Sequence, residues 1–312
     1  MDTANEDAIH PIGVAAARAG ISPDLVRAWE RRYRVVEPGR DDAGRRVYTS
    51  ADIARLRMLA RATDGGRSIG QVAELAPRAL AELIREDDAA RRADAPSTVV
   101  PEGTARVVEA ALEHGRRLDA PALEALLLRS SAVHGVPLLL RGVLVPLFRE
   151  VGELWHQGLL TPPQEHLVTA TVRGVLARVL GGIPAADDAP RLMVATTAGE
   201  RHEIGALLAA AAATVEGWSV TYLGADLPAA DIAVAAREVR ARAVAVSAVY
   251  APSLEALVME LETLRDALPD DVTLLVGGAA GASACQRLGN QGIRAPGDLD
   301  GLQGHLRALV RR

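Results

Sequence analysis

The feature that most constrains the fold is a change of hydrophobic pattern after Pro184. From there on, short apolar runs alternate with helix-length segments rich in Ala and Leu. The apolar runs lie at residues 191–196, 218–223, 243–247 and 272–276, and the helical segments at 203–216, 228–241 and 253–267. Strands that alternate with helices form a parallel sheet covered by helices on both faces. We therefore predict a doubly wound α/β domain over residues 185–312, with ligands bound outside the carboxyl ends of its strands.

Residues 104–184 predict a different, all-helical domain. Four helical stretches are separated by proline-containing breaks at residues 119–121, 135–137 and 161–163. Because such short connections join antiparallel neighbours, we expect a four-helix bundle. The preceding residues 87–103 are polar, weakly periodic and contain two prolines, which predicts a linker.

Residues 1–86 are expected to form a small α winged helix-turn-helix domain. A helix over 12–19 is stopped by Gly20, and Ser22 can cap a second helix that begins at Pro23. Residues 40–48, with a central glycine, predict a two-stranded wing. Two further helices are expected, one capped by Thr49 or Ser50 and one, carrying Ile69, Val72 and Leu75, capped by Ser68. An ordinary helical domain is the alternative.

Charge is unevenly distributed along the chain. Residues 10–70 hold twelve arginines against seven acidic residues, although the whole chain carries a net charge of −5. A basic module on an acidic body favours selective anion binding by the first part. The single cysteine, Cys285, excludes an intrachain disulfide and a thiolate-rich metal site. No apolar stretch approaches the ~20 residues of a membrane span and no targeting segment is evident, so we expect a cytoplasmic protein.

Three signals in the α/β domain fall at expected strand ends. They are Glu200-x-His202-x-x-Gly205, then Ser247-Ala-Val249 after 41 residues, then Gly277-Gly278 after a further 27. The combination resembles the cobalamin-binding domain of methionine synthase and base-off mutases. Glu200 stands where that pattern has Asp, and Val249 where it has Leu.

This resemblance implies that His202 is the lower axial ligand of cobalt. An imidazole nitrogen suits such a metal, and Glu200 would accept a hydrogen bond from the other ring nitrogen. By the same resemblance Gly205, Gly277 and Gly278 admit the nucleotide tail of the cofactor, and Ser247 donates a hydrogen bond to it. A solvated loop histidine is the alternative.

In the bundle, Trp155 is followed after nine residues by Glu165-His166. By themselves these residues would more often be a core tryptophan and surface polar groups. Beside a cobalamin domain, however, the motif resembles the CarH and LitR photoreceptors. The resemblance implies that Trp155, Glu165 and His166 make space for the adenosyl group of adenosylcobalamin. It also implies that His156 binds cobalt from the upper side after light has removed that group. Pro162 stands where a small aliphatic residue is expected.

The first 78 residues resemble the MerR-type winged helix-turn-helix. The resemblance covers residues 10–78 and rests on the runs at 26–33 and 44–53. It implies that the helix from Pro23 enters the major groove of operator DNA while the wing reaches the flanking phosphates. Trp29 is expected in the core. The expected DNA contacts are Arg27, Arg31, Arg32, Arg45, Arg46 and the hydroxyl of Tyr48, with Arg27 as a base contact.

Together these resemblances imply a regulator and not an enzyme. We expect a light-responsive, adenosylcobalamin-dependent transcriptional repressor of carotenoid or light-protection genes. It would bind operator DNA in the dark as a homo-oligomer, a dimer of dimers, and leave it when light breaks the cobalt–carbon bond. The alternatives are a cobalamin-sensing regulator without light response, and a corrinoid methyl carrier or cobalamin enzyme subunit.

Overall fold

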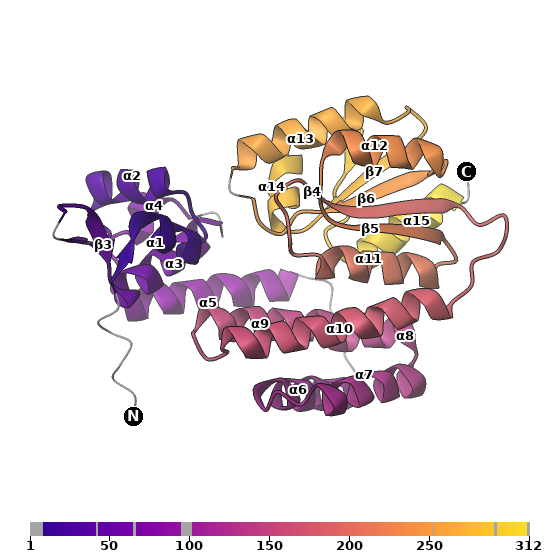
Figure 1. The fold of residues 1–312 in the computed structure, drawn as a ribbon, viewed down its shortest axis with the longest axis horizontal. Helices are drawn as coiled ribbons and strands as arrows, with labels where there is room; N and C mark the ends of the chain where they lie inside the picture. Colours follow the sequence, from indigo (N-terminus) through magenta and orange to yellow (C-terminus); the bar gives the residue numbers. More distant parts are fainter. Residues whose placement is uncertain are drawn as a thin grey trace. The chain divides into compact units, whose positions relative to one another are not determined.

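The computed structural model describes residues 9–41, 43–64, 67–94, 102–251, 253–289 and 292–310. The chain divides into two compact units, Met1–Val99 and Val100–Arg312 (Figure 1). The first unit holds the expected helix-turn-helix, and the second holds both the bundle and the α/β domain. Multidomain architecture of the predicted classes is therefore confirmed.

The first unit packs short helices around a small sheet. Its helices are α1 (Ile12–Ala19), α2 (Pro23–Tyr33), α3 (Ser50–Asp64), α4 (Ile69–Val72) and α5 (Pro77–Asp94). Ser22 caps α2 as predicted, because its hydroxyl oxygen accepts a hydrogen bond from the Leu25 amide at 3.1 Å. The helix after Ser68 is shorter than predicted, since α4 ends at Val72 and Leu75 lies beyond it.

The wing has one strand more than the sequence predicted. Strands β2 (Gly39–Arg40) and β3 (Arg46–Tyr48) pair as expected, but β1 (His10–Pro11) pairs with the other side of β3. A segment far upstream in the sequence adds this strand, which the local pattern of residues 40–48 could not reveal. Gly44, at φ +74°, makes the turn between β2 and β3.

The predicted linker is only partly outside regular structure. Helix α5 runs to Asp94, so residues 87–94 are helical, and Glu102 and Gly103 already belong to the next helix. Residues 95–101 lie outside the described residues. The polar composition of 87–94 had suggested a linker, yet the 18-residue α5 continues through it.

Four helical stretches form the bundle, as predicted (Figure 1). They are α6 (Glu102–Arg116), α7 (Ala120–His134), the continuous run of α8 (Val136–Leu138), η1 (Leu139–Leu144) and α9 (Val145–His156), and α10 (Pro162–Gly182). The π-helical segment η1 was not predicted. It ends just before Pro146, which has no N–H to donate to the preceding turn, and a proline at that point favours such an irregularity.

The α/β domain has a five-stranded parallel sheet in the order β5-β4-β6-β7-β8. The strands are β4 (Arg191–Thr197), β5 (Ser219–Leu227), β6 (Ala243–Ser247), β7 (Thr273–Gly277) and β8 (Ile293–Arg294). The helices are α11 (Ile204–Val215), α12 (Ala229–Glu238), α13 (Leu254–Ala267), α14 (Ala279–Leu288) and α15 (Leu299–Val310). The predicted strands and crossover helices are confirmed; β8, α14 and α15 were not predicted.

Alternate residues of the strands serve two separate cores. On one face of the sheet, Met193 and Ala195 pack with α12, α13 and α14. On the other face, Leu192 and Val194 pack with α11 and α15. The side of α11 turned away from the sheet joins the core of the bundle, so this helix connects the two domains of the second unit (Figure 1).

Candidate cofactor site and nucleic-acid interface

The three motifs of the α/β domain meet at the carboxyl ends of the central strands. The segment with Glu200 and His202 follows β4, the segment with Val249 follows β6, and Gly277-Gly278 ends β7. Strands β4 and β6 are neighbours, and the connections from them leave on opposite sides of the sheet. This is the switch point at which open α/β sheets bind ligands.

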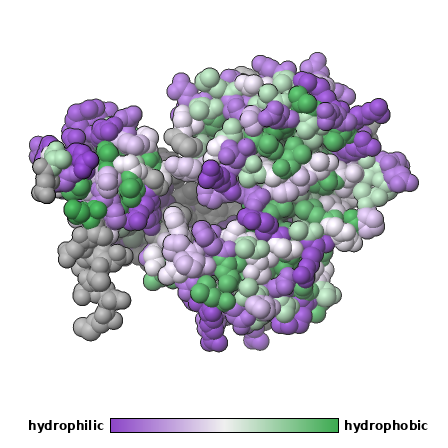
Figure 2. Space-filling view, viewed as in Figure 1, coloured by the Kyte–Doolittle hydropathy of each residue, from purple (hydrophilic) through white to green (hydrophobic). Residues whose placement is uncertain are grey.

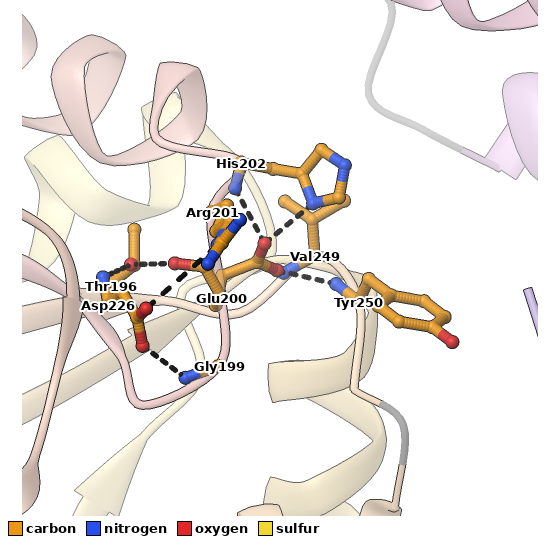
Figure 3. Close-up of polar contacts among 8 residues, drawn as sticks. All are labelled: Thr196, Gly199, Glu200, Arg201, His202, Asp226, Val249 and Tyr250. Carbon is orange, nitrogen blue, oxygen red and sulfur yellow. Dashed lines mark hydrogen bonds and ion pairs between the residues drawn. The ribbon is translucent and has the colours of Figure 1, made fainter. Parts of the chain in front are cut away.

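Glu200 is the organising residue of this edge (Figure 3). It is 1% exposed, yet its carboxylate accepts four hydrogen bonds. Oε1 accepts from the backbone amide of His202 at 2.7 Å and bonds its ring Nδ1 at 2.6 Å. Oε2 accepts from the backbone amides of Val249 and Tyr250, both at 2.7 Å. One side chain therefore ties the segment after β4 to the segment after β6.

A second set of bonds fixes the backbone around Glu200. The hydroxyl of Thr196 donates to the carbonyl oxygen of Glu200 at 2.5 Å and accepts from the amide of Asp226 at 2.9 Å. The carboxylate of Asp226 in turn accepts from the amide of Gly199 at 2.7 Å. Figure 3 shows these residues on one side of Glu200 and His202 on the other. Sequence reasoning missed Thr196 and Asp226, because neither belongs to the motif.

The electrostatics favour a charged Glu200 beside a readily protonated His202. Burial by itself would raise the pKa of Glu200, but the hydrogen bonds from His202 and Tyr250 outweigh it and hold the pKa below its ordinary value. The bond to Glu200 raises the pKa of His202 against the opposing effect of burial. The negative charge of Glu165, in α10 of the bundle, also raises the pKa of His202. A residue of the bundle therefore acts electrostatically on the candidate metal ligand.

The geometry of His202 suits a single metal bond. Its predicted hydrogen bond to Glu200 is present and uses Nδ1, while its side chain is 67% exposed. Among the described residues no partner bonds Nε2, and no three His, Cys, Asp or Glu side chains gather to hold a metal ion. Such a histidine fits a metal whose other ligands come from a cofactor ring, and Glu200 orients it in the way that carboxylates orient metal-bound imidazoles.

The glycines of the motifs differ in what requires them. A Cβ at Gly205 would lie 2.8 Å from the hydroxyl of Ser247, and one at Gly278, with φ +86°, would lie 2.2 Å from the carbonyl oxygen of Ala248. The fold itself therefore requires both glycines. A Cβ at Gly277 would meet nothing closer than 4.0 Å. The space at Gly277 is what a bound nucleotide tail could use, so the residues present fit a corrinoid.

The bundle motif lies at the junction of α9 and α10. Trp155 is in the last turn of α9 and is 38% exposed. Glu165, in the first turn of α10, accepts a bond from the Thr169 hydroxyl at 2.7 Å and bonds the ring Nδ1 of His166 at 2.5 Å. Pro162 begins α10. His156 ends α9, but its side chain lies outside what the structure describes.

The bundle and the α/β domain are joined by side chains that no motif revealed. Arg173 of α10 contacts Glu203 at 2.7 Å, and Arg141 of η1 contacts Asp300 of α15 at 2.6 Å. Leu207 of α11 lies in the bundle core. Single arginines on long helices gave no signal that they would pair across domains.

In the first unit, the candidate DNA-contacting arginines are exposed. Arg31 and Arg32 lie on α2, and hydrophilic residues cover most of the part of this unit that carries α2 and the wing (Figure 2). The other three candidate arginines are exposed too, and each forms an ion pair: Arg27 with Asp24, Arg45 with Asp41, and Arg46 with Glu30. Trp29, 5% exposed, lies in the core as predicted.

Tyr48 corrects the prediction for the wing. Its side chain is fully buried, and its hydroxyl donates to Glu30 of α2. Burial and the neighbouring carboxylate raise the pKa of Tyr48. The hydroxyl therefore packs the wing against α2 instead of reaching a phosphate, because the ring lies in the core formed with residues of α1, α2 and α3.

Comparison with known proteins places this arrangement in a family. The chain is 37% identical over 298 residues to the HTH-type transcriptional repressor CarH of Myxococcus xanthus, with 94% of this chain and 97% of that protein covered. The chain belongs to the CarH family of transcriptional repressors. It is also 32% identical over 270 residues to the repressor CarA of the same organism, covering 86% and 85% of the two chains.

The family's domains are matched separately along the chain. A model described as the MerR HTH family regulatory protein matches residues 11–79. Two models described as B12 binding domains match residues 104–180 and 190–295. The fold of the second unit is that of a solved corrinoid protein, the monomethylamine corrinoid protein of Methanosarcina barkeri. That structure is 15% identical with a TM-score of 0.53 and covers 65% of this chain and 98% of its own.

These matches establish a DNA-binding regulator with cobalamin-type cofactor domains. No described helix is long and apolar enough to cross a membrane.

Proposed function

We infer that this protein is a light-responsive repressor that uses adenosylcobalamin. The observation that carries this inference is His202, held by buried Glu200 at the switch point with Nε2 unbonded among described residues and with the bundle beside it. Relatedness to CarH and CarA supports the repressor function. We also propose action on carotenoid or light-protection genes, as the resemblance to the CarH and LitR photoreceptors implies.

In this proposal the α/β domain would hold the cofactor. Nε2 of His202 would ligate cobalt, and Glu200 would keep the imidazole in the required tautomer and orientation. Ser247, at the end of β6, and Gly277 line the path of the nucleotide tail, with Gly205, Val249 and Gly278 shaping the adjoining segments. Bound adenosylcobalamin would supply a cobalt–carbon bond that visible light can break.

The bundle would hold the adenosyl group. Trp155, Glu165 and His166 would enclose it, with Glu165 fixed by Thr169. His156, one residue beyond Trp155, would ligate cobalt once light has removed that group. Because the two arrangements of the bundle bind different forms of the cofactor, light shifts a two-state equilibrium between them.

The first unit transmits this equilibrium to DNA. Helix α2 enters the major groove, and the exposed arginines of α2 and the wing bind phosphates. Dark-state oligomers, which we propose to be dimers of dimers, present paired heads to two half-sites. Dissociation in the light leaves single heads, which bind weakly.

The experiment that tests this function follows size and operator binding of the same sample. Full-length protein loaded with adenosylcobalamin is expected to elute as a large species and shift operator DNA in the dark. After green light it should dissociate, elute later from the size-exclusion column as a smaller species, and release the DNA. An unchanged DNA shift with a cobalamin-dependent affinity would instead establish a light-independent cobalamin sensor.

The ligand assignment has its own test. His202→Ala is expected to weaken cobalamin binding and change the cobalt absorption spectrum. His305→Ala, a substitution in α15 outside the motifs, serves as the control. An unaltered spectrum in His202→Ala would remove His202 as the ligand.

A further inference from the structure

Glu203, the residue directly after His202, connects three elements of the second unit. Its Oε1 contacts Nε of Arg173 in α10 at 2.7 Å, and its Oε2 accepts a hydrogen bond from the hydroxyl of Tyr222 in β5 at 2.5 Å. Glu203 itself precedes α11, and its side chain is only 17% exposed. We call Arg173, Glu203 and Tyr222 the Glu203 network.

The network lies where the bundle meets the sheet domain. Leu207 and Leu208 of α11 belong to the bundle core, while Ala206 and Ala210 of the same helix belong to the core beneath the sheet. Any movement of the bundle relative to the sheet domain must therefore alter packing along α11. The amino-terminal end of α11 directly follows Glu203 and His202, the proposed cobalt ligand.

Two of the three members stay with the sheet domain. Tyr222 belongs to β5, and its hydroxyl holds one carboxylate oxygen of Glu203 in place. Burial and the Glu203 charge raise the pKa of Tyr222, so its hydroxyl remains a donor over the physiological range. Arg173 is the member that belongs to the bundle. Displacement of the bundle would leave Glu203 partly buried without its cation, which is costly.

We propose that the Glu203 network is a latch that holds the bundle against the sheet domain, with Arg173 and Glu203 as its positioning residues. The latch sets how readily the bundle leaves its docked position. The role of the latch in the light response rests on the proposed function. A weaker latch would favour the displaced arrangement before and after illumination.

The first test measures bundle position without cofactor or light. Spin labels are attached to cysteines that replace Val133 of α7 and Met259 of α13, both well exposed, in full-length protein that also carries Cys285→Ser. The distance between the two labels reports the position of the bundle relative to the sheet domain. Arg173→Met is expected to raise the ratio of displaced to docked populations about five- to thirtyfold. The matched control is Arg307→Met, since Arg307 is 54% exposed against 53% for Arg173 and pairs with Glu216 inside the sheet domain.

Coupling within the network distinguishes a latch from general loss of stability. Glu203→Gln should shift the distances in the same direction, and the double variant should shift them little further than either single variant. Identical distance distributions in Arg173→Met and Arg307→Met, or additive effects in the double variant, would overturn the proposal.

The second test uses the loaded protein. Arg173→Met should release operator DNA at a lower light dose than wild type, with an unchanged cobalt spectrum, while Arg307→Met should match wild type. If the wild-type protein does not release DNA in the light, the proposed function is wrong, and the latch is then tested by the distance measurements alone. If wild type responds and Arg173→Met responds at the same dose, the latch fails.

Discussion

At the scale of single residues, Glu200 determines what His202 can do. Its four hydrogen bonds stabilise a carboxylate that is almost completely buried, and one of them occupies Nδ1 of His202. A buried charge is tolerated only with such partners. Although Glu replaces the Asp of the cobalamin-binding pattern, its longer side chain still reaches the ring.

This pair predicts a pH dependence of stability in the cofactor-free protein. The pKa of Glu200 lies below its ordinary value of 4.5, so its contribution is present above pH 4.5 and is lost as the pH falls through the lowered pKa. The pKa of His202 lies above its ordinary value of 6.5, so its contribution is present below pH 6.5 and is lost as the pH rises through the raised pKa. Both contributions are complete between these two values.

Glu200→Gln should remove this dependence. We expect it to lower the free energy of unfolding by about 1–3 kcal/mol, because the neutral amide cannot satisfy the same four donors. Urea unfolding followed by circular dichroism should show the largest difference from wild type between pH 4.5 and 6.5. Glu216→Gln, which leaves His202 untouched, is the control; a loss that stays constant as the pH rises above 6.5 would show that Glu200 acts without His202.

At the scale of elements, the connections after the strands are shaped by close backbone approach. The turn from β7 into α14 passes so near Ala248 that a side chain at Gly278 has no room, whereas its neighbour Gly277 has. The two glycines of this motif are therefore needed for different reasons. The fold requires Gly278, whereas the space at Gly277 is where we propose that the nucleotide tail lies.

Substitution of each glycine by alanine separates these demands. Gly278→Ala is expected to destabilise the protein by about 2 kcal/mol or more, because it combines a positive φ with a clash against backbone. Gly277→Ala should unfold within about 0.5 kcal/mol of wild type yet bind cobalamin more weakly. Thermal unfolding and cobalamin titration of both variants test this. Full cobalamin affinity in Gly277→Ala would remove the nucleotide tail from that position.

At the scale of the whole molecule, the cofactor site and the DNA-binding surface belong to different compact units. Every described contact of the candidate cofactor site, including the effect of Glu165 on His202, lies within residues 100–312. The basic arginines of α2 and the wing lie within the first unit. Cofactor binding should therefore not require the DNA-binding head.

A fragment of residues 100–312 tests this division. We expect it to bind adenosylcobalamin with the absorption spectrum of the full chain and to show no affinity for operator DNA. Absorption spectroscopy and a DNA shift assay measure the two properties, with the full chain as the reference. A fragment that folds, by circular dichroism, but no longer binds cobalamin would show that the head completes the cofactor site.

The sequence alone determined the order of the domains and the central motif. Hydrophobic periodicity is local, so it located β4, β6, β7 and the crossover helices, and the motif spacing placed Glu200 beside His202. Cap residues are equally local, which is why the start of α2 at Pro23 was predicted correctly.

Only the tertiary structure decided contacts between distant segments. Tyr48 is buried among residues of α1, α2 and α3, the anchoring of Glu200 depends on amides 49 and 50 residues away, and Arg173 contacts Glu203 across a domain boundary. A residue's neighbours along the chain carry no record of such partners. Packing brings them together because buried polar groups must find hydrogen bonds wherever the fold supplies them.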